Sequence, residues 1–494
     1  LFAFSPYTGG GDYNFINPYT YELPHGVILS FFAIYQLMKY LENPVRGRII
    51  TLGISAGMVF LTKPEVSLAA FTAVIIGFLI AVYSENISYR TFAKKISWFV
   101  LSLGIPPLSF FIYFSFHMSM VNALKATLGQ WAYVVGYPSF RNLPYYQWVR
   151  GTDFLWQNIS TIFFYGFIFT ITAALAFFIN HKLRQFSGNI NLLNFLLSLL
   201  VIGTLQYFSS SIPLLELLRP LPLFMIGFGV YLIVMIKKNF RNRAYLVQKI
   251  PLFTLTIFSF VLMFKMIFRV HIYHYGFALA MPATMVLIVI MVYEIPLWIK
   301  KVSLTNKTYR VFSLAIIIAA IFAHVNYTYW LSQLKGYPVA SGRDLILDYR
   351  SEFNPRGKIF NQALEFINQE MNADQTFATF PSTMMMNYLA RRRDPIKTLG
   401  YNAGTWMFLG ENYVMDLLKK SPPLYVVFID RDFSGLGFEA FGKDFGGNIF
   451  SWVHQNYESV RLFGDPPFSG KGFGIEILKR PGSIPDSSPQ PYGK

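Results

Sequence analysis

Residues 250–298 read IPLFTLTIFSFVLMFKMIFRVHIYHYGFALAMPATMVLIVIMVYEIPLW. Two almost wholly apolar runs flank a short stretch that contains Lys265, Arg269, His271 and His274. A helix needs about 20 mostly apolar residues to cross a bilayer, so each run predicts one membrane helix. The stretch between them is then a polar turn at one membrane surface, and its concentration of basic and protonatable side chains needs an explanation.

The rest of the chain extends this pattern. It has 494 residues, of which 54% are hydrophobic and 14% are charged, against about 25% charged in soluble domains. Lys63-Pro64-Glu65 separates two of the apolar runs, so these two could also form a hairpin that does not fully cross. We predict a polytopic α-helical membrane protein with about ten transmembrane helices, at 23–41, 49–62, 65–83, 97–116, 160–180, 192–210, 214–236, 250–268, 275–298 and 311–330.

The orientation follows from the basic residues in alternate connections. One set of connections contains 17 Lys and Arg, and the other contains 7 even when the long loop 117–159 is counted. Because cytoplasmic loops are enriched in Lys and Arg, the first set is predicted to be cytoplasmic. Residues 1–22, the loop 117–159 and everything after 331 are then expected on the outer side.

The net charge and the missing motifs argue against several classes of protein function. The formal charge of +17 is explained by basic membrane loops that contact anionic lipid, so no nucleic-acid partner is expected. The chain has no cysteine, which excludes disulfides, thiolate catalysis and cysteine-type zinc sites. The phosphate-binding, dinucleotide-binding, zinc-protease and nucleophile-elbow motifs are all absent.

The predicted membrane domain covers 1–335 and is followed by a small extracytoplasmic α/β domain at 336–480. Helical and strand patterns alternate there, from GKIFNQALEFINQEM and QTFATF to LYVVFID, GNIFSWVHQNY and GFGIEILKR. This alternation predicts helices packed on a mostly parallel sheet. Residues 481–494 are rich in Pro and Ser and are predicted to be disordered.

The predicted topology places several ionisable residues on the same outer side. Lipid phosphate groups are suitable partners for basic residues there, through charge-assisted hydrogen bonds. The alternatives are snorkelling of single Lys and Arg side chains and internal ion pairs such as Lys63–Glu65 and Glu216–Arg219. The candidate phosphate-binding residues are Lys265, Arg269, His271, His274, Arg219 and Lys63, and the candidate carboxylates are Asp12, Glu22 and Glu65.

Two further groups of side chains allow a binding role. The outer loop contains Tyr133, Tyr137, Tyr145 and Trp148, whose aromatic faces can stack on sugar rings or can simply lie at the membrane interface. The run Arg391–Arg393 is either a solvated charge run or a contact for anionic head groups or an acceptor.

The segments NPYTYELPHGVILSFFAIYQL, GMVFLTKPEVSLAA, HYGFALAMPA and MMMNYLARRRDP resemble bacterial members of the GT-C glycosyltransferase superfamily. The nearest likeness is to family 39-like proteins, which include protein mannosyltransferases and the aminoarabinose transferase of lipid A. PPLYVVFIDRDFSGLGFEAFGKDFGGNIFSWVHQNY is similar to the external domain of the same group. The likeness is spread over most of the chain in short stretches without a diagnostic catalytic motif.

The resemblance implies a multi-pass enzyme of the bacterial inner membrane that takes a sugar from a polyprenyl-phosphate donor, with inversion, on the outer face. An acidic residue in the first external loop is the general base in that superfamily, and we expect this loop to precede Leu1. Asp12 and then Glu22 are the best remaining candidates, with Glu65 a third. Lys265, Arg269, His271 and His274 match the region before the family-like HYGF and would bind the carrier phosphate, with Arg219 beside them. A divalent metal is left open.

Two other functions remain from the sequence. A transporter or flippase for lipid-linked sugars would use the same basic residues without chemistry, although no internal repeat of the kind common in transporters is seen. A polysaccharide polymerase or ligase would also suit a large external loop. The sugar and the acceptor, whether glycan, lipid or protein, stay open.

Overall fold

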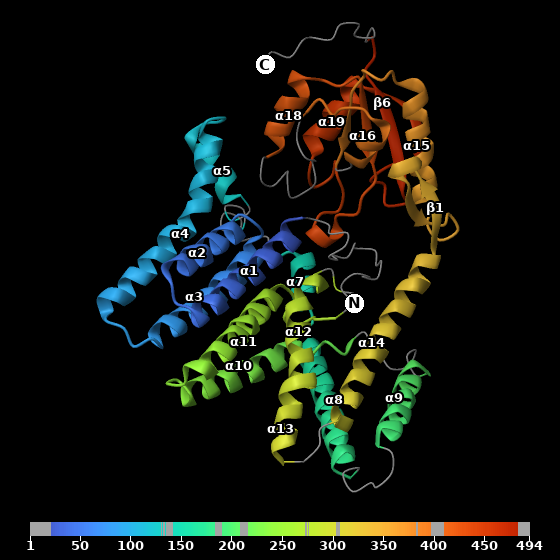
Figure 1. Cartoon of the computed structure of the whole chain (residues 1–494). Helices are drawn as coiled ribbons and strands as arrows, with labels where there is room; N and C mark the ends of the chain where they lie inside the picture. Colours follow the sequence, from blue (N-terminus) through green and yellow to red (C-terminus); the bar gives the residue numbers. More distant parts are fainter. Residues whose placement is uncertain are drawn as a thin grey trace. The chain divides into compact units, whose positions relative to one another are not determined.

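A computed structural model describes residues 21–129, 131, 134, 142–182, 190–207, 216–271, 274, 276–302, 307–381, 384–396 and 410–482. The chain forms two compact units (Figure 1). Unit 1 consists of Leu1–Asn142 and Tyr146–Tyr329, and unit 2 consists of Leu143–Tyr145 and Trp330–Lys494. The division falls inside the last turns of a long helix, slightly before the boundary at 335 that the sequence predicts.

Unit 1 is helical, and a helix occupies each of the ten segments predicted from the apolar runs. Its main helices are α1 (Glu22–Glu42), α2 (Arg46–Phe60), α3 (Pro64–Tyr83), α4 (Tyr89–Ser115), α5 (Met120–Leu128), α7 (Pro144–Arg150), α8 (Leu155–Lys182), α9 (Ile190–Tyr207), α10 (Leu221–Lys238), α11 (Arg243–Leu262), α12 (Met281–Val289), α13 (Ile295–Val302) and α14 (Lys307–Gln333). A π-helical turn, Ile290–Glu294, joins α12 to α13.

Among the described residues, seven helical segments are long and apolar enough to cross a membrane. They contain α3, α4, α8, α10, α11, the α12–α13 helix and α14. Crossing by α1, α2 and α9, which would complete ten spans, stays a prediction. The length and apolarity of these seven segments indicate a membrane-embedded helical protein.

Small residues allow the helices of unit 1 to approach one another closely. A side chain at Gly53 would collide with Ser102 Oγ, and one at Gly57 would lie 2.9 Å from Cδ of Pro106, so α2 packs directly on the backbone of α4. A side chain at Gly77 of α3 would likewise collide with Oγ1 of Thr254 in α11, so these two helices also pack closely. Close backbone contact at small residues is the usual means of helix association in a membrane, where apolar burial between helices contributes little.

Unit 2 contains two sheets with flanking helices. Its elements are β1 (Lys335–Val339), β2 (Ile346–Tyr349), α15 (Arg356–Glu370), β3 (Phe377–Phe380), α16 (Met384–Ala390), α18 (Glu411–Lys420), β4 (Tyr425–Ile429), α19 (Gly447–Asn456), β5 (Glu458–Gly464) and β6 (Gly474–Lys479). β1 and β2 form a two-stranded antiparallel ribbon, and the larger sheet has the order β3-β4-β6-β5. The disorder predicted for 481–494 concerns residues that, beyond 482, lie outside the described part of the chain.

The prediction of a mostly parallel sheet is wrong, although the predicted helices and strands are present. β3 and β4 are parallel, but β6 runs antiparallel to both β4 and β5. The reason is the short connection between β5 and β6, which holds no helix and can only form a hairpin. The sequence analysis also missed β5, because ESVRLFG is mostly exposed and lacks the apolar alternation of a half-buried strand.

Phenylalanine rings fill the core on one side of the larger sheet. Phe428 of β4 stacks on Phe450 of α19 with ring centroids 5.3 Å apart, and Phe441 lies over Phe380 at 6.0 Å. Gly446 precedes α19 in a left-handed conformation with a φ of 69°. A Cβ atom there would overlap the Phe441 ring, so only glycine lets the chain enter α19 beneath the aromatic cluster.

Gly446→Ala is expected to lower the free energy of unfolding of unit 2 by about 3 kcal/mol, through left-handed strain and overlap with Phe441. Gly470 is the matched control, since it has a φ of 74° and open space around a Cβ atom. Gly470→Ala should cost only about 1 kcal/mol. Chemical denaturation of the purified variants measures both values, and equal losses would contradict the role given to Phe441.

Candidate functional site

Three segments of unit 1 meet at one group of polar side chains. They are the junction of α7 and α8, the turn that begins at Glu216 before α10, and the chain after α11 that leads to His274. We call this group the polar cluster and define it by its members, which are Trp148, Asp153, Asn158, Glu216, Arg219, Arg269, His271 and His274.

Arg219 joins all three segments. Its Nε donates to the carboxylate of Glu216, one turn earlier in the chain. Its Nη1 donates to Oδ1 of Asn158 at 3.1 Å and to the carbonyl oxygen of Phe268 at 3.3 Å. Arg219 is 8% exposed, so this almost buried guanidinium has a carboxylate and two neutral acceptors, as a buried charge requires.

Arg269 has a matching set of partners on the α7–α8 side. Its Nη1 lies 3.2 Å from Oδ2 of Asp153 and donates to the carbonyl oxygen of Trp148 at 3.3 Å. Its guanidinium also lies 5.5 Å from the centre of the Trp148 ring, a cation–π contact. The two arginines lie close enough that each influences the other electrostatically.

The two histidines are neutral members of the cluster. Nε2 of His274 donates to the carbonyl oxygen of Val149 at 2.7 Å, and Nδ1 accepts from the N–H of Gly276 at 2.9 Å. Burial is the largest effect on this ring and lowers the pKa of His274 to about 4. Burial also lowers the pKa of His271, whose ring meets that of His274 edge-on at 5.7 Å. Neither ring adds positive charge near neutral pH, and His274 holds the end of α7 in place.

Lys265 forms a third ion pair, which lies beside the cluster. Its Nζ lies 3.0 Å from Oε1 of Glu65, at the start of α3, and Lys63 also acts electrostatically on that carboxylate. Lys265 in turn acts on His274, together with Arg219 and Arg269. Among the described residues, these contacts gather the cations Arg219, Arg269, Lys265 and Lys63 around the carboxylates Glu216, Asp153 and Glu65.

Gly151 allows the segments to come together. Its φ is 79°, and a Cβ atom there would lie 2.9 Å from the carbonyl carbon of Phe268 and 3.0 Å from Cβ of Arg269. Hydrogen bonds hold the backbone on both sides, from the N–H of Phe268 to the carbonyl of Arg150 and from Asn158 Nδ2 to the carbonyl of Gly151. Glycine is required at this position by conformation and by space.

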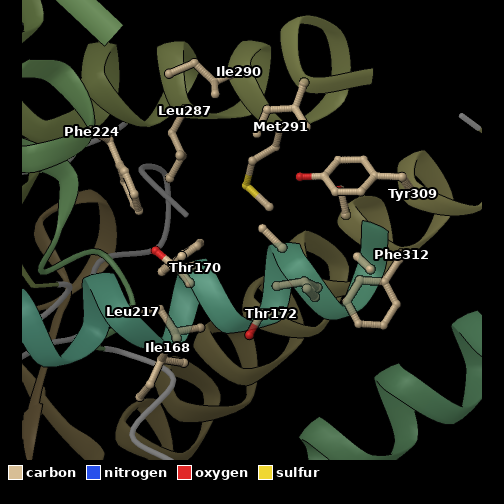
Figure 2. A pocket seen from close by; sticks show the side chains of 16 residues that line it. Ile168, Thr170, Thr172, Leu217, Phe224, Leu287, Ile290, Met291, Tyr309 and Phe312 are labelled. Atoms are coloured by element: carbon tan, nitrogen blue, oxygen red, sulfur yellow. The ribbon is translucent and has the colours of Figure 1, made fainter. Parts of the chain in front are cut away.

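An apolar cavity of about 260 Å³ lies in the same unit, between α8, α10, the α12–α13 helix and α14. Figure 2 shows Met291 and Tyr309 pointing into it above α8. Leu217 also lines this cavity, and its neighbour in the chain is Glu216 of the polar cluster. Asn158 and Ile168 lie on the same helix, so the polar cluster and the cavity are about 15 Å apart along α8.

The structure brings together most of the residues that the sequence analysis selected. Arg219, Arg269, His271, His274 and Trp148 are in the polar cluster, with Lys265, Lys63 and Glu65 beside it. Glu22 is the exposed first residue of α1, and Tyr145 lies in α7 but belongs to unit 2. Asp12, Tyr133 and Tyr137 lie outside the described residues.

The sequence analysis missed Asp153 and Asn158. Both stand in the polar stretch RGTDFLWQN that precedes the apolar part of α8, and a carboxylate and an amide so near a membrane helix are the signal that could have selected them.

Comparison with protein-family models and with curated protein sequences finds no match to this chain.

Gly151→Ala should separate the α7–α8 junction from Arg269 and lower the free energy of unfolding by about 2–3 kcal/mol. The melting temperature of the detergent-solubilised protein should fall by several degrees as a result. Gly437→Ala is the control, because Gly437 has the same φ of 79° in a left-handed conformation, yet a Cβ atom there makes only ordinary contact, 3.6 Å from Cδ2 of Leu143. Differential scanning fluorimetry measures the two shifts. Equal shifts would show that the contact with Phe268 and Arg269 is unimportant.

Proposed function

We propose that the protein is a membrane glycosyltransferase that transfers a sugar from a polyprenyl-phosphate-linked donor to an acceptor on the outer side of the membrane. The observation that supports this most is the gathering of Arg219, Arg269 and Lys265 in one unit with an apolar cavity. A lipid phosphate needs both features, cations for its head and an apolar space for its chain.

The arrangement of charges suits a phosphate that leaves during the reaction. Arg219 and Arg269 are positioned before any ligand arrives, through Glu216 and Asp153. Fixed cations stabilise charge that develops in a transition state without reorganisation. A phosphate oxygen would join or replace a carboxylate in these pairs.

Among the residues that the structure describes, Glu65 is the best candidate for the general base. A carboxylate that accepts the proton of an acceptor hydroxyl has to lie across the sugar from the departing phosphate, because inversion requires attack from the opposite face. Glu65 is on α3, an element that supplies neither Arg219 nor Arg269. The ion pair of Glu65 with Lys265 has to open for this role, while Arg219 and Arg269 bind the phosphate. Glu22 and the undescribed Asp12 remain the alternatives.

The location of the cluster favours transfer over transport. Arg269, His271 and His274 lie between the membrane-crossing segments Arg243–Met266 and Phe277–Lys301, at the ends of helices. Secondary transporters bind their substrates near the middle of the membrane, on interrupted helices. A cluster at the helix ends instead suits a reaction at the membrane surface.

The test is sugar transfer by the full chain in nanodiscs, with a panel of radiolabelled polyprenyl-phosphate sugars and a mixture of envelope acceptors. Arg269→Gln should lower the transfer rate about 100-fold or more, because it removes one preorganised cation from the phosphate. Arg243→Gln is the control: Arg243 donates to the carbonyl of Leu41 at 2.8 Å in another part of unit 1. This control should keep its rate within about threefold.

Folding is checked through the melting temperature of each variant, and Arg219→Lys provides a second cluster variant that keeps the charge. A folded Arg269→Gln variant with unchanged transfer would refute the role of the polar cluster. Absence of transfer by the parent chain with every donor would refute the transferase proposal itself.

A further inference from the structure

The β1–β2 ribbon of unit 2 carries an exposed apolar surface. Leu345, Ile346 and Leu347 follow one another in the chain and are 50%, 45% and 51% exposed, and nearby Phe353 is 62% exposed. Ile346 pairs with Val339 and Leu347 with Pro338, so the two side chains point to opposite faces of the ribbon. Three consecutive exposed apolar residues are unusual on a soluble surface and indicate that something covers them.

The edge of this ribbon is also open. Among the described residues, β2 pairs only with β1, so no further strand covers its other edge. The opposite side of the ribbon is occupied, because Asn361 of α15 donates to the carbonyl of Pro338 and accepts from the N–H of Ala340. The apolar surface is therefore the outward part of a firmly held ribbon.

The region around the ribbon is basic, whereas the rest of unit 2 is acidic. Residues 335–358 and 391–394 together have eight Lys and Arg against four Asp and Glu, a formal charge of +4. Residues 330–494 as a whole have a formal charge of only +1, so the remainder has −3. The two segments adjoin, because Asp344 accepts from Tyr388 Oη at 2.8 Å and pairs with Arg391.

The path of the chain indicates that a membrane surface covers these apolar residues. α14 has the length and apolarity of a membrane helix and ends at Gln333, and β1 begins at Lys335. Ile346 and Leu347 pair with the far end of the five-residue strand β1, so they lie within about 15 Å of the point where the chain leaves the helix, and Leu345 directly precedes them. A surface tethered this closely meets lipid head groups at a high effective concentration.

We propose that the β1–β2 ribbon binds the surface of the bilayer, with Leu345–Leu347 and Phe353 at the level of the head groups and the surrounding Arg and Lys residues against anionic lipid. Apolar and aromatic side chains rimmed by cations are the combination that binds such an interface. The inference rests on α14 crossing the membrane and does not depend on the transferase proposal.

The absence of cysteine allows a direct test with single labels on the full chain. Leu347→Cys would carry an environment-sensitive fluorophore in nanodiscs that contain anionic lipid with nitroxide groups near the top of the acyl chains. Leu462→Cys is the matched control, because Leu462 is an apolar residue of β5 that is 45% exposed. The melting temperature of each labelled protein confirms that it is folded.

Quenching at position 347 is expected to exceed quenching at position 462 by about threefold or more. Equal quenching at the two positions would overturn the proposal. Efficient disulfide cross-linking of two Leu347→Cys copies, with no excess quenching, would also overturn it and would assign the open edge of β2 to a second copy of the chain. Either negative result leaves the sugar-transfer experiment unaffected.

Discussion

The ion pairs of Arg219 and Arg269 are the interactions on which the rest of unit 1 depends. Removing a charge from water costs several kcal/mol, and a partner that is lost leaves that cost uncompensated. Glu216 and Asp153 provide the partners, while Asn158 Oδ1 and the carbonyl oxygen of Phe268 accept hydrogen bonds from Nη1 of Arg219. The same contacts that join the helix ends therefore also fix two cations in position before any ligand binds.

The neutral histidines complete this arrangement. A protonated ring beside Arg219, Arg269 and Lys265 would add repulsion, and burial keeps the pKa of His274 near 4. The two histidines consequently add no positive charge to the cluster near neutral pH. His274 instead uses both ring nitrogens to connect the end of α7 to the turn before α12.

Much of unit 1 could be predicted from the sequence, because apolar length alone locates a membrane helix. The polar turn between two apolar runs also pointed to Lys265, Arg269, His271 and His274. Their partners could not be predicted in the same way: Asn158 is 61 residues from Arg219 in the chain, and no local pattern records that contact. In unit 2 the helices and most strands were predictable, but the direction of β6 depends on the hairpin with β5, whose exposed residues gave no periodic signal.

The proposed role of unit 1 depends on the polar cluster binding the phosphate of a lipid. The most direct measurement is the affinity of the full chain for a polyprenyl phosphate and for the polyprenol of the same chain length, followed by tryptophan fluorescence or native mass spectrometry. The account predicts that the phosphate binds about tenfold more tightly or better, a difference of about 1.4 kcal/mol. Equal affinities would contradict it, because the apolar cavity alone would then explain the binding.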